Sequence, residues 1–351
     1  MKRAYFIGGD THCHHTDLAV VTSGGRLTKQ CQLPTTIPAL VAALKEVPRP
    51  RYLTFEEGPL ADWLHRSLLP FVDGITVCDP RRNHLISKDG DHADPIDAVK
   101  LAHLLRGGFV KAVHHPESLD RSAFKHLVNL YNDRIRHRVQ EANRIMACFR
   151  RYGVFLNETS FVEPDQRAES LNRLPNRSSV RSNVRLLLRG YDMACQQVKE
   201  LQRRLVRQAR RIPEIQRFTA LPGVQWIRAS IFFAYIDTPW RFKSKSALWR
   251  YMGIGLQRWQ SGNGAERVRV VPSTQACRPL KYAILGAAIS AIAARDNPFA
   301  EQHRRWLAQG ILPRNARRNV ARSQAMTLWG MWKNGDVYRP ERVGIQASMA
   351  R

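Results

Sequence analysis

The sequence lacks a long apolar run and lacks cysteine pairs at the spacing of metal or redox sites. Its longest apolar stretch, residues 283–294, falls short of the roughly 20 residues that span a bilayer, so we interpret it as a packed helix of small residues. The 6 cysteines are scattered, with no Cys-x-x-Cys pair. This pattern indicates reduced thiols in a cytoplasmic protein and argues against membrane and zinc-finger classes.

Acidic residues are also scarce. The 351 residues include 56 Lys and Arg but only 29 Asp and Glu, a formal net charge of +27. So large an excess repels itself in a compact fold unless a polyanion neutralises it. Nucleic acid is the expected polyanion, because phosphate contacts release counterions. The alternative is a basic surface that serves solubility alone.

The first hundred residues alternate between strand and helix patterns. Short apolar runs predict strands at 5–10, 18–22, 27–33, 52–56 and 75–78, and helical spacing predicts helices at 37–45 and 60–69. Ser23-Gly24-Gly25-Arg26 has the composition of a hairpin turn. Three strands joined by hairpins and followed by two strand–helix units is the order of a ribonuclease H-like fold. We therefore predict an α/β domain of RuvC/ribonuclease H-like type over residues 1–115.

The middle of the chain carries two heptad-like patterns, in which apolar residues are three and four apart. The positions are Val128, Tyr131, Ile135, Val139, Ala142, Met146 and Phe149, then Val184, Leu187, Tyr191, Val198, Leu201 and Leu205. They predict an antiparallel coiled-coil hairpin over residues 116–211, with a long polar tip over 157–182. Residues 212–351 then predict a small, mostly helical domain with a basic tail.

Four acidic residues stand where two metal ions could be held. Asp10 ends the first predicted strand, Glu56 ends the fourth, and Asp94 and Asp97 open a helix. Cleavage of a phosphodiester by metal ions needs several carboxylates that converge from different elements. Asp94 and Asp97 are three apart and share a helix face. Asp94-Pro95-Ile96-Asp97 also fits an ordinary helix start with Asp94 as the cap, and one carboxylate can serve both roles.

Arginines cluster on the second predicted helix of the hairpin and near the C-terminus. The candidates for nucleic-acid binding are Arg203, Arg204, Arg207, Arg210, Arg314, Arg317 and Arg318. Because basic helix faces are often only solvated, both interpretations stay open.

Ser261 precedes Gly262 in a polar, glycine-rich segment. A serine hydroxyl that is activated can form a covalent phosphoserine and conserve the energy of the broken DNA bond. The alternative is a turn serine. Ser244 and Ser246 have the sequence context of helix caps. His12-Cys13-His14-His15 predicts a polar turn beside Asp10, since adjacent residues rarely converge on one zinc ion.

Several short motifs occur in an order that resembles one family. They are Gly8-Gly9-Asp10, Glu56-Glu57-Gly58-Pro59, Asp94-x-x-Asp97-Ala98, Leu221-Pro222-Gly223-Val224, Arg241-Phe242, Tyr251-Met252-Gly253-Ile254, Ser261-Gly262 and Asn297-Pro298-Phe299. This ordered set resembles the insertion-sequence-one-ten transposases over nearly the whole chain. No single motif is strong; the order carries the resemblance.

The resemblance implies a DNA recombinase. It implies Asp10, Glu56, Asp94 and Asp97 as the Mg²⁺-binding catalytic acids and Ser261 as the nucleophile of a covalent phosphoserine intermediate. It also implies a structured guide (bridge) RNA that pairs with donor and target DNA, and a homo-oligomer, either a dimer or a tetramer. His92 and Ala93 depart from the Lys-Thr that the family often has there.

Two other functions fit the same residues. One is a metal-dependent, structure-specific endonuclease of the Holliday-junction type, in which the acids act with water and no covalent intermediate forms. The other is a non-catalytic nucleic-acid-binding protein. The sequence also leaves open whether Glu56 or Glu57 faces the metal; we prefer Glu56, because Leu53 and Phe55 share the opposite, apolar face.

Overall fold

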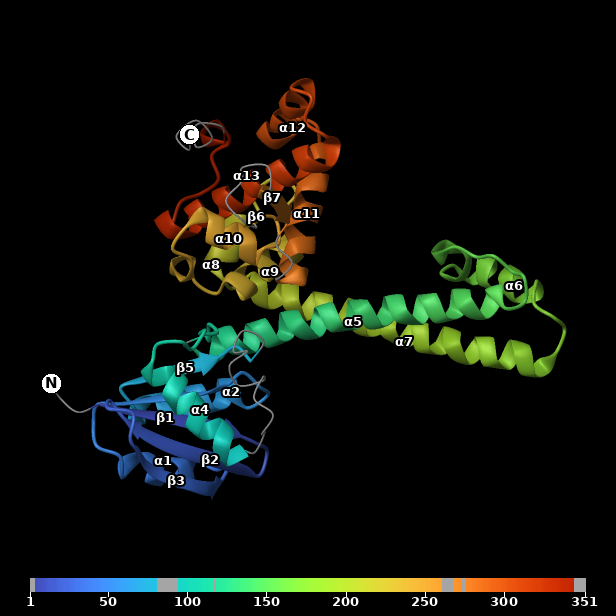
Figure 1. Cartoon of the computed structure of the whole chain (residues 1–351). Helices are drawn as coiled ribbons and strands as arrows, with labels where there is room; N and C mark the ends of the chain where they lie inside the picture. The colour runs from blue at the N-terminus through green and yellow to red at the C-terminus, as the bar shows by residue number, and fades with distance from the viewer. Residues whose placement is uncertain (1–3, 81–93, 117, 261–267, 273–275, 344–351) are drawn as a thin grey trace. The chain divides into compact units, whose positions relative to one another are not determined.

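The computed structural model describes residues 4–80, 94–116, 118–260, 268–272 and 276–343 (Figure 1). The chain forms two compact units, Met1–Ser122 and Ala123–Arg351. The first unit contains both strands and helices and the second is mostly helical, as the sequence predicts. The finer division at residues 115 and 211 stays a prediction.

The N-terminal unit is built on a five-stranded sheet with the strand order β3-β2-β1-β4-β5. The strands are β1 (Tyr5–Thr11), β2 (His15–Thr22), β3 (Leu27–Pro34), β4 (Arg51–Glu56) and β5 (Gly74–Cys78). The first three form an antiparallel meander, whereas β4 pairs parallel to β1 and β5 parallel to β4. All five predicted strands are confirmed. The assignment to the RuvC-like class stays a prediction.

Helices lie on both faces of this sheet (Figure 1). They are α1 (Ile37–Lys45), α2 (Ala61–Leu68) with the short η1 (Leu69–Phe71), and α4 (Asp94–Arg106). Because side chains alternate along a strand, Ile7, Leu53 and Phe55 enter one core with α1 and α2. Residues one step along β1 and β4 face the opposite way, toward α4.

The approach of α4 to β1 is unusually close. A Cβ atom on Gly8 would lie 2.1 Å from the carbonyl oxygen of Ala98 and 2.5 Å from the amide nitrogen of Ala102. The backbone of α4 therefore packs against a strand position that has no side chain, and Ala98 and Ala102 are themselves fully buried. The docking carries the first turn of α4 toward the ends of β1 and β4.

The second unit includes two long helices, α5 (Leu119–Arg150) and α7 (Ser178–Ala209), which run side by side (Figure 1). Val128, Tyr131, Val198, Leu201 and Leu205 are buried as the heptad pattern predicts. The pattern is wrong at Val139, which is 45% exposed. It is shifted by one residue elsewhere, because Ile145 and Leu188 are buried in place of Met146 and Leu187.

The polar stretch between these helices is folded, contrary to its appearance as a loop-like tip. It contains η2 (Glu158–Phe161) and α6 (Pro164–Asn172). Phe161 is fully buried and its ring meets that of Tyr191 edge-on at 5.2 Å. Isolated apolar residues such as Phe161 and Leu174 supply the core here, and their irregular spacing gives no periodic signal.

The rest of the second unit is a helical bundle with one small hairpin. Its elements are α8 (Pro213–Phe218), α9 (Trp226–Ile236), η3 (Pro239–Arg241), α10 (Lys245–Tyr251), β6 (Leu256–Gln260), β7 (Val268–Pro272), α11 (Arg278–Ala293), α12 (Pro298–Ala308), α13 (Pro313–Asn334) and η5 (Pro340–Arg342). Phe218, Phe232 and Trp332 pack their rings together in its core. The antiparallel β6–β7 pair was not predicted from the sequence. Among the described residues, every helix is too short or too polar to traverse a bilayer.

Replacing Gly8 by alanine tests the docking of α4. We expect the Gly8→Ala variant to lose about 3 kcal/mol of unfolding free energy, the upper end for an overpacked site, because the obstructing atoms are backbone. Gly58→Ala is the matched control, since a Cβ there has no neighbour within 4 Å. Denaturant unfolding measures both. Equal stability of the two variants would contradict the close contact.

Candidate functional site

A row of polar side chains crosses the sheet on the face that α4 covers. Asp10 pairs with Asp17 across β1 and β2, and Asp17 pairs with Gln32 across β2 and β3. On the other side, Gly9 pairs with Phe55, so the next step along the parallel strands puts Asp10 beside Glu56. Cys78 of β5 pairs with Glu56. Asp10 lies two residues after Gly8 and therefore shares the α4 face.

Asp97 joins this row from the first turn of α4. Burial, and then the negative charges of Asp10 and Asp97, raise the pKa of Glu56 above its ordinary value. The carboxylates of Asp10, Glu56 and Asp97 are thus close enough to repel one another. A basic side chain of α4 lies beside one of these acids, since Lys100 Nζ is 3.7 Å from Asp97 Oδ1.

Asp10 is held by the turn that follows it. His12 Nε2 lies 3.3 Å from Asp10 Oδ2, and the His12 ring stacks on His15 with centroids 4.8 Å apart. The backbone amide of His12 donates to the carbonyl of His15 at 2.9 Å. The segment from His12 to His15 is therefore a turn beside Asp10, as predicted.

The donor set suits a hard divalent cation. Carboxylate oxygens are the ligands that Mg²⁺ prefers, and a bound cation would relieve the repulsion that raises the pKa of Glu56. Within the described residues, no three His, Cys, Asp or Glu side chains are grouped closely enough to hold a metal ion. The helix begins at Asp94 as predicted, but the Asp94 side chain lies outside the described part. The acids share a face without closing on a common point.

The structure distinguishes the two adjacent glutamates. Glu56 is the last residue of β4 and interacts with Asp10 and Asp97, as its pKa shows. Glu57 follows the strand, is exposed, and donates its backbone amide to the carbonyl of Cys78 at 2.9 Å. The geometry favours Glu56 as the acid of this row.

Sequence reasoning missed Asp17 and Cys78. Asp17 is only 3% exposed, and its Oδ2 accepts a hydrogen bond from the Gln32 amide at 3.2 Å. Burial, with Glu56 nearby, raises the pKa of Cys78 to about 12, so its thiol stays protonated. Pairing the strands across the predicted His12–His15 turn would have put Asp17 opposite Asp10. Nothing in the sequence singled out Cys78.

The predicted nucleophile, Ser261, lies outside the described residues; in the sequence it directly follows Gln260, the last residue of β6. Ser244 caps α10, since its side chain accepts a hydrogen bond from the Ala247 amide at 3.2 Å, as predicted.

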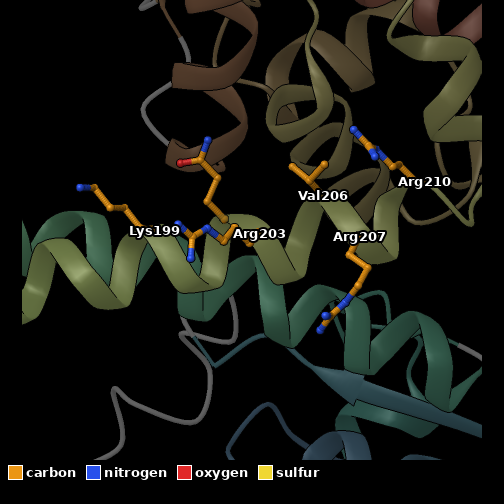
Figure 2. Close-up of a pocket in the computed structure, with 6 residues that line it drawn as sticks. Lys199, Arg203, Val206, Arg207 and Arg210 are labelled. Atoms are coloured by element: carbon orange, nitrogen blue, oxygen red, sulfur yellow. The ribbon is translucent and has the colours of Figure 1, made fainter.

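The basic candidates separate into groups. Arg203, Arg207 and Arg210 project from α7 and, with Lys199, line a hollow of about 590 Å³ (Figure 2). Arg204 points elsewhere and lies 3.8 Å from Glu200. On α13, Arg314 and Arg317 are exposed, and Arg318 is half-buried.

Residues 215–304 match the model of the Transposase IS116/IS110/IS902 family. This match supports an insertion-sequence transposase. The matched segment runs from α8 into α12 and includes both strands of the hairpin and position 261. No curated protein matches the chain. A transposase is an enzyme that binds, cuts and joins DNA, which agrees with the net charge of +27.

The crowding of the acids predicts an unusual effect of Glu56→Gln. Because the folded-state pKa is raised, the native protein binds this proton more tightly than the unfolded chain does. The free energy of unfolding therefore falls as the pH rises from the ordinary value of 4.5 through the raised pKa. Without divalent cations, we expect Glu56→Gln to be more stable than the parent at neutral pH and to lose this advantage below pH 4.5.

Denaturant unfolding at the two pH values measures the effect. Glu57→Gln is the matched control, because Glu57 is the adjacent glutamate and is exposed. If Glu57→Gln gained as much stability as Glu56→Gln, the gain would come from total charge, and the acidic row would not be its source.

Proposed function

We propose that this protein is the transposase of an insertion sequence, which cuts and rejoins DNA strands with metal-binding acids and a serine nucleophile. The observation that carries the proposal is the family match over residues 215–304, the segment that includes Ser261. The placement of Asp10 and Glu56 in one row, with Asp97 above it, supports it independently. The family match supports DNA binding and strand joining.

Asp10, Glu56, Asp94 and Asp97 would hold Mg²⁺ at the α4 face of the sheet. A bound cation would neutralise charge that builds up on the phosphate during cleavage. His12 orients Asp10 by its contact at 3.3 Å, and Lys100 balances Asp97. Because the pKa of Glu56 is raised, cation binding would compete with the proton of this carboxyl.

Ser261 would supply the covalent step. Its Oγ attacks the scissile phosphorus, the bond between phosphorus and one deoxyribose oxygen breaks, and the Ser261 proton ends on the departing sugar oxygen. The product is a phosphoserine ester of DNA and a free sugar hydroxyl. When the hydroxyl of another strand attacks that ester, a new DNA phosphodiester forms and the proton returns to Ser261. No external energy source is needed.

A structured guide RNA and assembly as a dimer or tetramer are proposed on the resemblance of the motifs to the insertion-sequence-one-ten family. The net charge of +27 agrees with binding to a polyanion, whether RNA or DNA. The same resemblance supports a location at the bacterial nucleoid.

One observation favours a second candidate, a metal-dependent endonuclease of the Holliday-junction type. The acidic row lies wholly in the first unit, Met1–Ser122, so hydrolysis by water could proceed without the serine. A covalent protein–DNA adduct separates the two functions, because a hydrolase never attaches itself to DNA.

Replacing an acid tests the proposed cation site. We expect Asp10→Asn and Asp97→Asn each to reduce strand cleavage about 100-fold or more, since even residues that merely support ligands cost 10–100-fold. Binding of DNA should change little. Glu57→Gln serves as the control for loss of one exposed negative charge. If Asp97→Asn cleaves at the parent rate but melts at a lower temperature, Asp97 only stabilises the start of α4.

Replacing Ser261 tests the nucleophile. Protein, guide RNA, cognate DNA and Mg²⁺ are incubated, denatured and examined for DNA that migrates with protein. We expect Ser261→Ala to form no adduct and Ser261→Cys to retain part of it, because a thiolate is also a nucleophile. Ser246→Ala, an exposed serine of α10, is the control. An adduct in Ser261→Ala at the parent level would exclude Ser261; cleavage without any adduct in the parent would favour the endonuclease.

A further inference from the structure

One face of α7 carries a stripe of polar and charged residues along the whole helix. Its positions are three or four residues apart, which is the spacing of a single helix face. They are Arg181, Arg185, Arg189, Asp192, Gln196, Lys199, Arg203, Arg207 and the C-cap Arg210. At about 1.5 Å per residue, the stripe is about 44 Å long.

The stripe is exposed, and its cations form no ion pairs with acidic residues other than the contacts named here, within the described part of the chain. Arg185, Arg189, Lys199, Arg203 and Arg207 are all exposed. Among the described residues no ion pair involves any of them, whereas the off-stripe Arg204 pairs with Glu200 at 3.8 Å. Arg210 lies over the Trp226 ring at 5.6 Å, a contact that leaves its charge intact. A row of cations along one rigid helix, without acidic partners, can contact several charged groups of an extended polyanion.

The single acid of the stripe, Asp192, is neutralised by another element. Arg167 of α6 donates from both terminal nitrogens to the two Asp192 carboxylate oxygens, each at 2.8 Å. The same guanidinium donates from Nε to the carbonyl of Phe161 at 2.9 Å, which fixes it to the folded tip. This bidentate pair is the strong form of an ion pair. The tip between α5 and α7 therefore neutralises the acid of the stripe, Asp192. Glu200, which lines the same hollow as Lys199 and Arg203, pairs with Arg204 at 3.8 Å.

We infer that this stripe, called here the α7 rail, binds the phosphate backbone of double-stranded DNA without reading its sequence. Within each half of the rail, neighbouring cations are about 4.5–6 Å apart along the helix axis, close to the spacing of phosphates, whereas about 15 Å separates Arg189 from Lys199. The rail is longer than one turn of a B-form duplex, about 34 Å. The described lining of the two hollows along its second half consists only of α7 residues and the C-cap, with Lys199 and Arg203 in both.

A duplex fits the rail better than a single strand. Proteins that hold single strands place aromatic rings among the cations, so that bases can stack. No rail position is aromatic, and Tyr191, the one aromatic residue of α7, is buried at 5% exposure. A surface of guanidinium and ammonium groups alone meets phosphates and leaves the bases paired.

The inference rests on the proposed function, since the duplex is the DNA whose strands are exchanged. Its test uses binding alone, with a chelator present, so that it does not depend on the acids or on Ser261. The full-length protein is titrated with a random-sequence DNA duplex of 30 base pairs at several salt concentrations. Arg203→Gln is compared with Arg204→Gln, because these neighbours differ in direction but hardly in helix propensity.

We expect Arg203→Gln, and Arg185→Gln at the other end of the rail, to weaken binding. Each should reduce the slope of log K against log salt by about 0.9, the value for one phosphate contact. Arg204→Gln should leave the slope unchanged. Equal effects of Arg203→Gln and Arg204→Gln would overturn the rail. So would tighter binding of a single strand, or of an RNA duplex, than of the DNA duplex. A parent that binds as expected but joins no strands would refute the proposed function and leave the rail intact.

The role of Arg167 has its own test. Arg167→Met exposes the charge of Asp192 on the rail, so we expect weaker binding of the duplex. Adding Asp192→Asn removes that charge and should restore binding, even where the melting temperature stays low. If the double variant binds as weakly as Arg167→Met, Arg167 acts only by stabilising the tip and the continuity of the rail is refuted.

Discussion

The contact between Gly8 and α4 is the constraint on which the candidate site depends. With no side chain at Gly8, the backbone of the helix packs directly on β1, within 2.5 Å of where a Cβ would stand. Asp10 and Glu56 already lie side by side through the register of β1 and β4. Only a helix this close can bring Asp97 near enough to act on Glu56. Backbone packing thus creates electrostatic strain at one place on the sheet.

That strain contrasts with the charge of the rest of the chain. The protein carries +27 overall, yet its first unit brings the half-buried acids Asp10, Glu56 and Asp97 close together. Crowded carboxylates destabilise a fold unless they serve a cation. Part of the excess positive charge lies in a row on one face of α7, where the acid Asp192 is neutralised by Arg167. A hard cation bound at the acidic row would neutralise its negative charge, and a polyanion bound at the α7 rail would neutralise its positive charge.

Much of this could be predicted from the sequence. Strand ends at Asp10 and Glu56 follow from apolar runs, and α4 begins at Asp94 because Pro95 and the acids favour a helix start. Cys78 could not be recognised, since its importance comes from strand register, which local patterns do not encode. Asp17 was missed because the predicted second strand begins at Leu18, one residue after it, although the turn before it gives the pairing with Asp10. The folded tip was not predicted because its buried residues, such as Phe161 and Leu174, are irregularly spaced in the sequence. The β6–β7 hairpin was not predicted, because its two short strands flank a polar, glycine-rich segment that has the composition of a loop.

The most direct test of the account is the number of protons released when Mn²⁺ binds. Calorimetric titration at mildly acidic pH, in two buffers of different ionisation enthalpy, measures it. Because its pKa is raised, the Glu56 carboxyl holds a proton more tightly than a free glutamate does, and a cation shared by Asp10, Glu56 and Asp97 would compete with that proton. The account predicts proton release in the parent and none in Glu56→Gln. Binding with no proton release, or no binding at all, would contradict it.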